Sequence, residues 1–94
     1  MLLAGSFYAS RQGCYRLAFD VFPKARNMRI RLKMGSAEDE FSLDAGRWQT
    51  LNMEHYLERH ERCWYSILVL KENYRKDEIL VHNLKARYMK NGSD

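Results

Sequence analysis

The chain has 94 residues and a net charge of +4, and 46% of its residues are hydrophobic. This length allows one domain over residues 1–94 with one core, and the apolar content excludes a disordered chain. No run approaches the roughly 18 apolar residues of a membrane span, so no membrane partner is expected. The positive charge favours an acidic partner.

The first half of the chain alternates between apolar and polar residues. Residues 7–9 are a short candidate strand. Strict alternation over residues 15–21 predicts a half-buried strand with the odd-numbered side chains inward. Residues 23–27 form the next turn, because they begin with proline and end with asparagine. Residues 28–34 alternate again, with the even-numbered side chains inward.

The middle of the chain predicts shorter strands. The acidic run at residues 38–40 is expected in a loop, followed by a strand at residues 41–43 and a turn at residues 44–46. Trp48 opens the next strand and is expected in the core. Residues 52–62 fit a helical and a strand pattern equally well, and a strand followed by a charged loop is favoured because its neighbours are strands.

Two further strands are predicted near the end of the chain. Residues 64–70 are the most apolar strand, and residues 71–77 form a polar loop. In residues 79–88 the apolar side chains move from odd to even positions, and a β-bulge at residues 82–83 restores one inward face. Six to eight short antiparallel strands predict an all-β sandwich of jelly-roll-like form.

Three stretches carry a recognisable pattern. Residues 13–21 read Gly-Cys-Tyr-Arg-Leu-Ala-Phe-Asp-Val, residues 41–50 contain Phe-x-Leu-x-x-Gly-x-Trp, and residues 79–86 read Ile-Leu-Val-His-Asn-Leu-Lys-Ala. In this order they resemble the jelly-roll carbohydrate-binding modules of the galactose-binding-like type. The resemblance implies a glycan ligand and a buried Trp48. The same architecture also occurs in virion decoration and fibre proteins.

Metal, cofactor and catalytic chemistry have little support in the sequence. His82 stands where the resembled closing strand has an aspartate that helps hold calcium, and a neutral imidazole suits that hard cation poorly. His55, His60 and Cys63 do not match a known zinc spacing. Cys14 and Cys63 are expected as reduced thiols. No nucleophile or phosphate-loop motif is present, so neither enzyme activity nor a cofactor is predicted.

Basic side chains form the clearest charge pattern. The cations expected to point outward are Arg16, Arg29, Arg31, Lys33, Lys85 and Arg87. Within residues 28–34 they lie about 6.8 Å apart, close to the spacing of successive phosphates or sulfates. Arg16 is expected beside them on a paired strand, with only Asp20 adding an opposite charge. These outward cations can be explained either by contact with an anionic ligand or by the ordinary exposure of polar side chains on the outer face of a strand.

An apolar row and exposed aromatic residues suggest a second kind of contact. Trp64, Leu68 and Leu70 would point away from the core, so this strand is either covered on both faces or part of an interface. Trp64 and Tyr74, with Tyr8, could alternatively stack on sugar rings, because a flat aromatic face matches the C–H face of a pyranose.

These observations lead to three hypotheses. The leading one is a non-catalytic module that binds a polar or anionic glycan. The second is a virion structural, decoration or fibre-associated protein that self-assembles as a homo-oligomer or on a particle. The third, less favoured, is a nucleic-acid-binding domain; an acidic protein surface is the other partner that the charge allows. Without a signal peptide, the chain is expected in a virion or a larger extracellular assembly, or otherwise in the cytoplasm.

Overall fold

The computed structural model describes residues 3–70 and 75–90. The described residues form β1 (Leu3–Tyr8), β2 (Gly13–Pro23), β3 (Arg29–Met34), β4 (Ala37–Ser42), β5 (Gln49–Leu57), β6 (Arg62–Val69), the short 3-10 helix η1 (Lys76–Glu78) and β7 (Ile79–Lys90). The all-β prediction is therefore confirmed. In the described part of the chain, no helix has the length and apolar character needed to cross a membrane.

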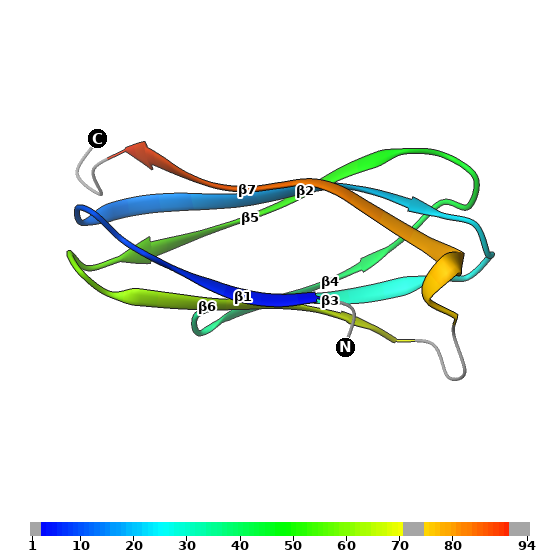
Figure 1. Cartoon of the computed structure of the whole chain (residues 1–94), viewed down its shortest axis with the longest axis horizontal. Helices are drawn as coiled ribbons and strands as arrows, with labels where there is room; N and C mark the ends of the chain where they lie inside the picture. Colours follow the sequence, from blue (N-terminus) through cyan, green and yellow to red (C-terminus); the bar gives the residue numbers. More distant parts are fainter. Residues whose placement is uncertain (1–2, 71–74, 91–94) are drawn as a thin grey trace.

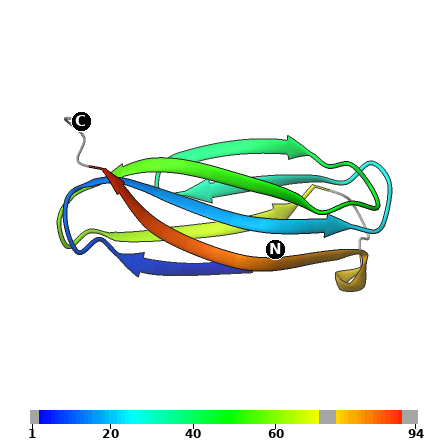
Figure 2. The ribbon, with the colours of Figure 1, turned by 90° about the horizontal axis from the view of Figure 1, so that it is seen from above.

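The strands form two antiparallel sheets that pack face to face (Figures 1 and 2). The four-stranded sheet has the order β1-β6-β3-β4, and the three-stranded sheet has the order β5-β2-β7. The chain crosses from one sheet to the other at each connection except the β3–β4 hairpin. This winding is the jelly-roll-like sandwich that the sequence predicted. Because β2 and β3 lie in different sheets, the expectation that Arg16 lies beside the β3 cations is wrong.

The core lies between the inner faces of the two sheets. The largest fully buried side chains are Leu17, Phe19, Val21, Pro23, Met28, Ile30, Leu32, Met34, Leu57, Cys63 and Ile67. These positions confirm the inward faces predicted for residues 15–21 and 28–34. Burying each large apolar side chain contributes about 1.5–3 kcal/mol, so these alternating rows supply the main stabilisation of the sandwich.

The acidic run contradicts its predicted loop. Residues 38–40 lie within β4, which pairs with β3 along its whole length. Gly35 has a φ of 61°, which lets the chain reverse immediately after Met34 so that β4 begins at Ala37. The acidic side chains then lie opposite basic ones, and such cross-strand pairs stabilise a strand of low intrinsic β-propensity.

Other boundaries agree more closely with the sequence. Residues 49–57 form a strand and a charged turn follows, as favoured for the ambiguous segment. The register of β7 shifts between the pairs Ala18–Lys85 and Asp20–His82, which confirms the predicted bulge. The predicted loop at residues 71–77 lies partly outside the described residues.

The two cysteines are free. Cys63 points into the core, where burial raises the pKa of its thiol. Cys14 occupies an even-numbered position of β2, on the opposite side of the three-stranded sheet from the core-facing Tyr15 and Leu17. The two thiols therefore lie on different sides of the sheet, in agreement with the expectation that they remain reduced.

Candidate ligand-binding face

Each cation of the basic row on β3 is paired with a glutamate of its own sheet. Arg29 lies 2.8 Å from Glu40, and Arg31 lies 2.9 Å from both Glu38 and Glu40. Lys33 lies 3.9 Å from Glu38. Hydrogen bonding to Glu40, opposed by desolvation and supported by the nearby carboxylates, raises the pKa of Arg31. The expectation that only Asp20 would dilute this row is wrong, because β4 supplies a parallel row of acids.

The remaining predicted cations lie on the opposite side of the molecule, on the outer face of the three-stranded sheet. We call this surface the candidate face. Its strands are held in register by the neighbouring pairs Arg16–Glu54 and Asp20–Thr50 between β2 and β5, and by Arg16–Arg87 and Ala18–Lys85 between β2 and β7. The candidate face comprises Arg16, Ala18, Asp20, Phe22, Trp48, Thr50, Asn52, Glu54, His82, Asn83, Lys85, Arg87 and Met89.

One end of the candidate face is aromatic. The ring of Trp48 packs against Phe22, with 5.4 Å between ring centroids, and against His82, with 4.9 Å between them. Trp48 is 47% exposed and precedes the first residue of β5, so its predicted place in the core is wrong. An aromatic ring that packs against two neighbours and remains about half exposed is suited to stacking.

The loop before β5 holds this ring in place. The side-chain carbonyl of Gln49 accepts a 3.0 Å hydrogen bond from the backbone N–H of Asp44, and its amide donates to the backbone oxygens of Asp44 and Arg47. Gly46, with a φ of 78°, donates through its N–H to the Pro23 carbonyl at 2.8 Å. The tryptophan is therefore presented by a closed, hydrogen-bonded turn.

Trp48 was missed as a surface residue although the sequence contains a signal for it. The inward residues of β5 are odd-numbered, as Met53 and Leu57 are buried. Trp48 has the same parity as Thr50 and Asn52, which are exposed. Extending the alternation of the strand backward by one residue therefore predicts an outward tryptophan.

The centre of the candidate face is a polar network around Asp20. Its carboxylate accepts a 2.7 Å hydrogen bond from the Thr50 hydroxyl and a 2.8 Å bond from the Asn83 side-chain amide. The hydrogen bond from Asn83, and after it the one from Thr50, lowers the pKa of Asp20. The charges of His82 and Lys85 make smaller contributions in the same direction. Asn83 reaches this position because it occupies the bulge with a φ of 58°. The network fixes polar groups beside the aromatic end.

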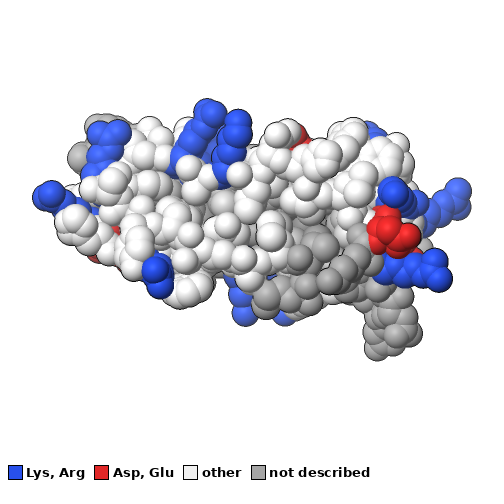
Figure 3. Space-filling model, viewed as in Figure 1, with Lys and Arg blue, Asp and Glu red and all other residues white. Residues whose placement is uncertain are grey.

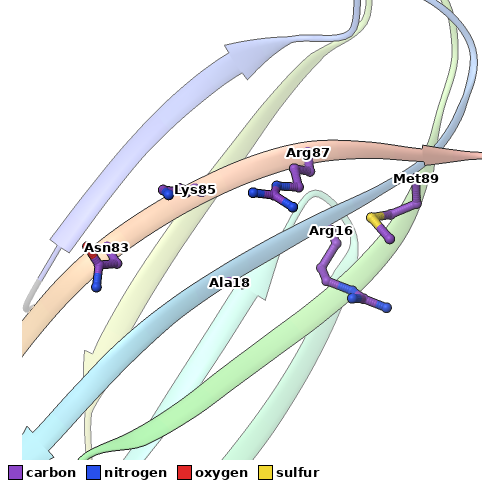
Figure 4. A pocket seen from close by; sticks show the side chains of 6 residues that line it. All are labelled: Arg16, Ala18, Asn83, Lys85, Arg87 and Met89. Atoms are coloured by element: carbon purple, nitrogen blue, oxygen red, sulfur yellow. The ribbon is translucent and has the colours of Figure 1, made fainter.

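The other end of the candidate face is a cationic hollow of about 170 Å³, lined by Arg16, Ala18, Asn83, Lys85, Arg87 and Met89 (Figure 4). Arg16 extends over β5, where it lies 2.7 Å from Glu54. Among the described residues, no carboxylate lies within ion-pair distance of Lys85 or Arg87. Figure 3 shows Lys and Arg side chains standing out along the upper edge, where Figure 1 places this sheet.

The described residues predicted for an interface or for sugar stacking lie on the far side of the sandwich, on the side of the four-stranded sheet that faces away from the core. Trp64 is 61% exposed and Tyr8 63% exposed, and the Arg62 guanidinium packs over both rings. Leu68 is half-buried and helps line a hollow of about 100 Å³. Leu70 follows β6 and is also half-buried. Tyr74 lies outside the described residues.

The predicted site residues are therefore divided between two opposite faces. Arg16, Lys85 and Arg87 are brought together, whereas the β3 row and Trp64 are separated from them by the whole sandwich. Among residues 3–70 and 75–90, no three His, Cys, Asp or Glu side chains gather in a way that could hold a metal ion.

Comparison with known protein families, curated proteins and solved structures gave no match.

Proposed function

We propose that this protein is a non-catalytic binding module that holds a glycan on the candidate face. The observation that carries the proposal is the half-exposed Trp48, whose ring packs against Phe22 and His82. An aromatic face offers the C–H side of a sugar ring an apolar contact of matching shape. The turn that carries the ring is already hydrogen-bonded without a ligand, which reduces the ordering that binding would require.

Polar groups next to the ring support the same proposal. Asn83 and Thr50 are oriented by Asp20, and Asn52 lies exposed beside them on β5. Sugar hydroxyls both donate and accept hydrogen bonds, and carboxylate, amide and hydroxyl groups together provide both kinds of partner. A small number of placed polar groups beside apolar contact area is the usual composition of a small-ligand site.

The proposal is tested by a glycan array followed by titration calorimetry on the glycans that bind. Trp48→Ala should weaken binding, whereas Trp64→Ala should leave it unchanged, because Trp64 lies on the opposite face. The two variants remove the same side chain from exposed positions, so each controls for the other. Equal affinity of wild type and Trp48→Ala would refute the candidate face as the binding site.

The second candidate function is a structural subunit, and a different surface favours it. The Arg62 guanidinium lies 4.5 Å from the centroid of the Tyr8 ring and 5.2 Å from that of Trp64. Tryptophan, tyrosine and arginine carry much of the energy at protein interfaces. A native mass measurement tests it: a defined oligomer that dissociates in Trp64→Ala would favour self-assembly.

The nucleic-acid hypothesis receives less support from the row that matched the phosphate spacing, because Arg29, Arg31 and Lys33 each lie within 4 Å of a glutamate on β4. Counterion release would make phosphate binding fall steeply with salt.

A further inference from the structure

We infer that the glycan is acidic: it carries a carboxylate or sulfate group that binds Lys85 and Arg87, while an uncharged ring of the same chain stacks on Trp48. This inference rests on the proposed function and adds the chemical class of the ligand and its direction across the sheet.

The difference between the two basic surfaces supports an acidic ligand. On β3 and β4, Arg29, Arg31 and Lys33 each lie within 4 Å of a glutamate of the same sheet. Lys85 and Arg87 likewise occupy neighbouring outward positions of one strand, on the candidate face. Among the described residues, however, no carboxylate lies within 4 Å of either cation. A ligand that brings its own anion can therefore form charge-assisted hydrogen bonds here without displacing a carboxylate of the described residues.

The shape of the hollow supports a small anionic group rather than a flat contact. Ala18 contributes only a methyl group to the floor, so the side chains of β7 stand above a depression of about 170 Å³. Figure 4 shows Lys85 and Arg87 along β7, with Arg16 directed away from them over β5. The hollow above Ala18, among these side chains, leaves room for a carboxylate or sulfate group.

Electrostatics set the direction of the chain. Asp20 lies between the aromatic end and the cationic hollow, and its hydrogen bonds hold the carboxylate in its charged form. Asp20 is two residues from Phe22 and two from Ala18 on β2, so its carboxylate would repel an acid group at either end of the candidate face. At Lys85 and Arg87 the acid group also meets two positive charges, which favours that end. Phe22, beside Trp48, and Ala18, in the hollow, are four residues apart on β2, a separation of about 13 Å. This length requires an oligosaccharide.

The inference is tested with oligosaccharides that share a backbone and differ only in charge. The probes are oligogalacturonate and its methyl ester, and a chondroitin sulfate oligosaccharide and its desulfated, carboxyl-reduced form, each titrated at low and at high salt. We expect the acidic member of at least one pair to bind about tenfold or more tightly at low salt. Salt should reduce this preference, because the contact is a solvent-exposed ion pair.

Variants separate the inference from the proposed function. Lys85→Gln with Arg87→Gln should remove the preference for the acidic member, while Arg29→Gln with Arg31→Gln, the matched control on the other sheet, should keep it. Trp48→Ala should weaken both members. Equal affinity for both members, or a preference that survives in the Lys85 and Arg87 variant, would overturn the inference but leave a Trp48-dependent glycan site standing.

Two further outcomes would contradict more than the preference for the acidic member of a pair. If none of the four probes binds and the array is also empty, the proposed function fails and the inference fails with it. If a single-stranded oligothymidylate binds more tightly than every glycan and requires Lys85 and Arg87, the hollow is a phosphate site, and the acidic glycan is excluded as its ligand.

Discussion

Replacing Trp48 with alanine should weaken ligand binding while leaving the domain folded. The ring is 47% exposed. A buried aromatic side chain covers roughly 150–250 Å², so about half of that, ~75–125 Å², is removed from water here. At about 25 cal/mol per Å², losing this contact lowers the free energy of unfolding by at most about 2–3 kcal/mol. The vacated space opens to solvent, so no internal cavity adds to the cost.

The comparison is Phe19→Ala, which removes a ring that is only 1% exposed and leaves a closed cavity. Its expected cost is about 3–5 kcal/mol. Both variants should be unfolded in urea and followed by far-ultraviolet circular dichroism, because tryptophan fluorescence changes with one of the substitutions. If Trp48→Ala destabilises the domain as much as Phe19→Ala does, the ring belongs to the core and the assignment of the candidate face is wrong.

Four further outcomes are expected. Because the pKa of Asp20 is lowered, its contribution to stability is present above the ordinary value of 3.8 and is lost as pH falls through the lower pKa of the folded state. Asp20→Asn should therefore reduce the dependence of the melting temperature on pH in that acidic range. Asn83→Val should destabilise by about 1–2 kcal/mol more than Asn83→Gly in urea titrations, because a β-branched residue is strained at positive φ. Glu38→Lys with Glu40→Lys should lower the melting temperature at low salt, and added salt should restore part of it. Chelator should leave the melting temperature unchanged; a fall reversed by calcium would show that oxygen ligands complete a site at the position of His82.

Alternation predicts which face of a strand is buried because that property is local. The side chains of a strand point to opposite sides by geometry, so Phe19 and Leu32 could be placed in the core without knowing their neighbours. The bulge near Asn83 was predictable for the same reason, because a change of phase within one strand requires an extra residue. These features account for the sandwich, its core and the outward direction of the predicted cations.

Pairing between strands is not local, and the errors arise there. Arg16 and Arg31 both point outward, as predicted, but they lie on opposite faces of the molecule because β2 and β3 belong to different sheets. Periodicity within a strand carries no information about which sheet the strand joins. Trp48 was misplaced for a different reason: the resembled motif implied burial, although the parity of its own strand points outward.

Whether a row of cations is available to a ligand depends more on the neighbouring strand than on the strand that carries the row. The β3 row has the regular spacing that a polyanion would match, yet β4 places Glu38 and Glu40 against it, so its charges are already paired. Lys85 and Arg87 form a shorter row, but the strand beside them contributes Ala18 and an arginine that is already held by Glu54. Among residues 3–70 and 75–90 no carboxylate pairs with Lys85 or Arg87, so an anionic ligand would not have to break an ion pair with any of these residues. The shorter row is therefore the stronger candidate for binding, and this ranking follows only once the strand pairings are known.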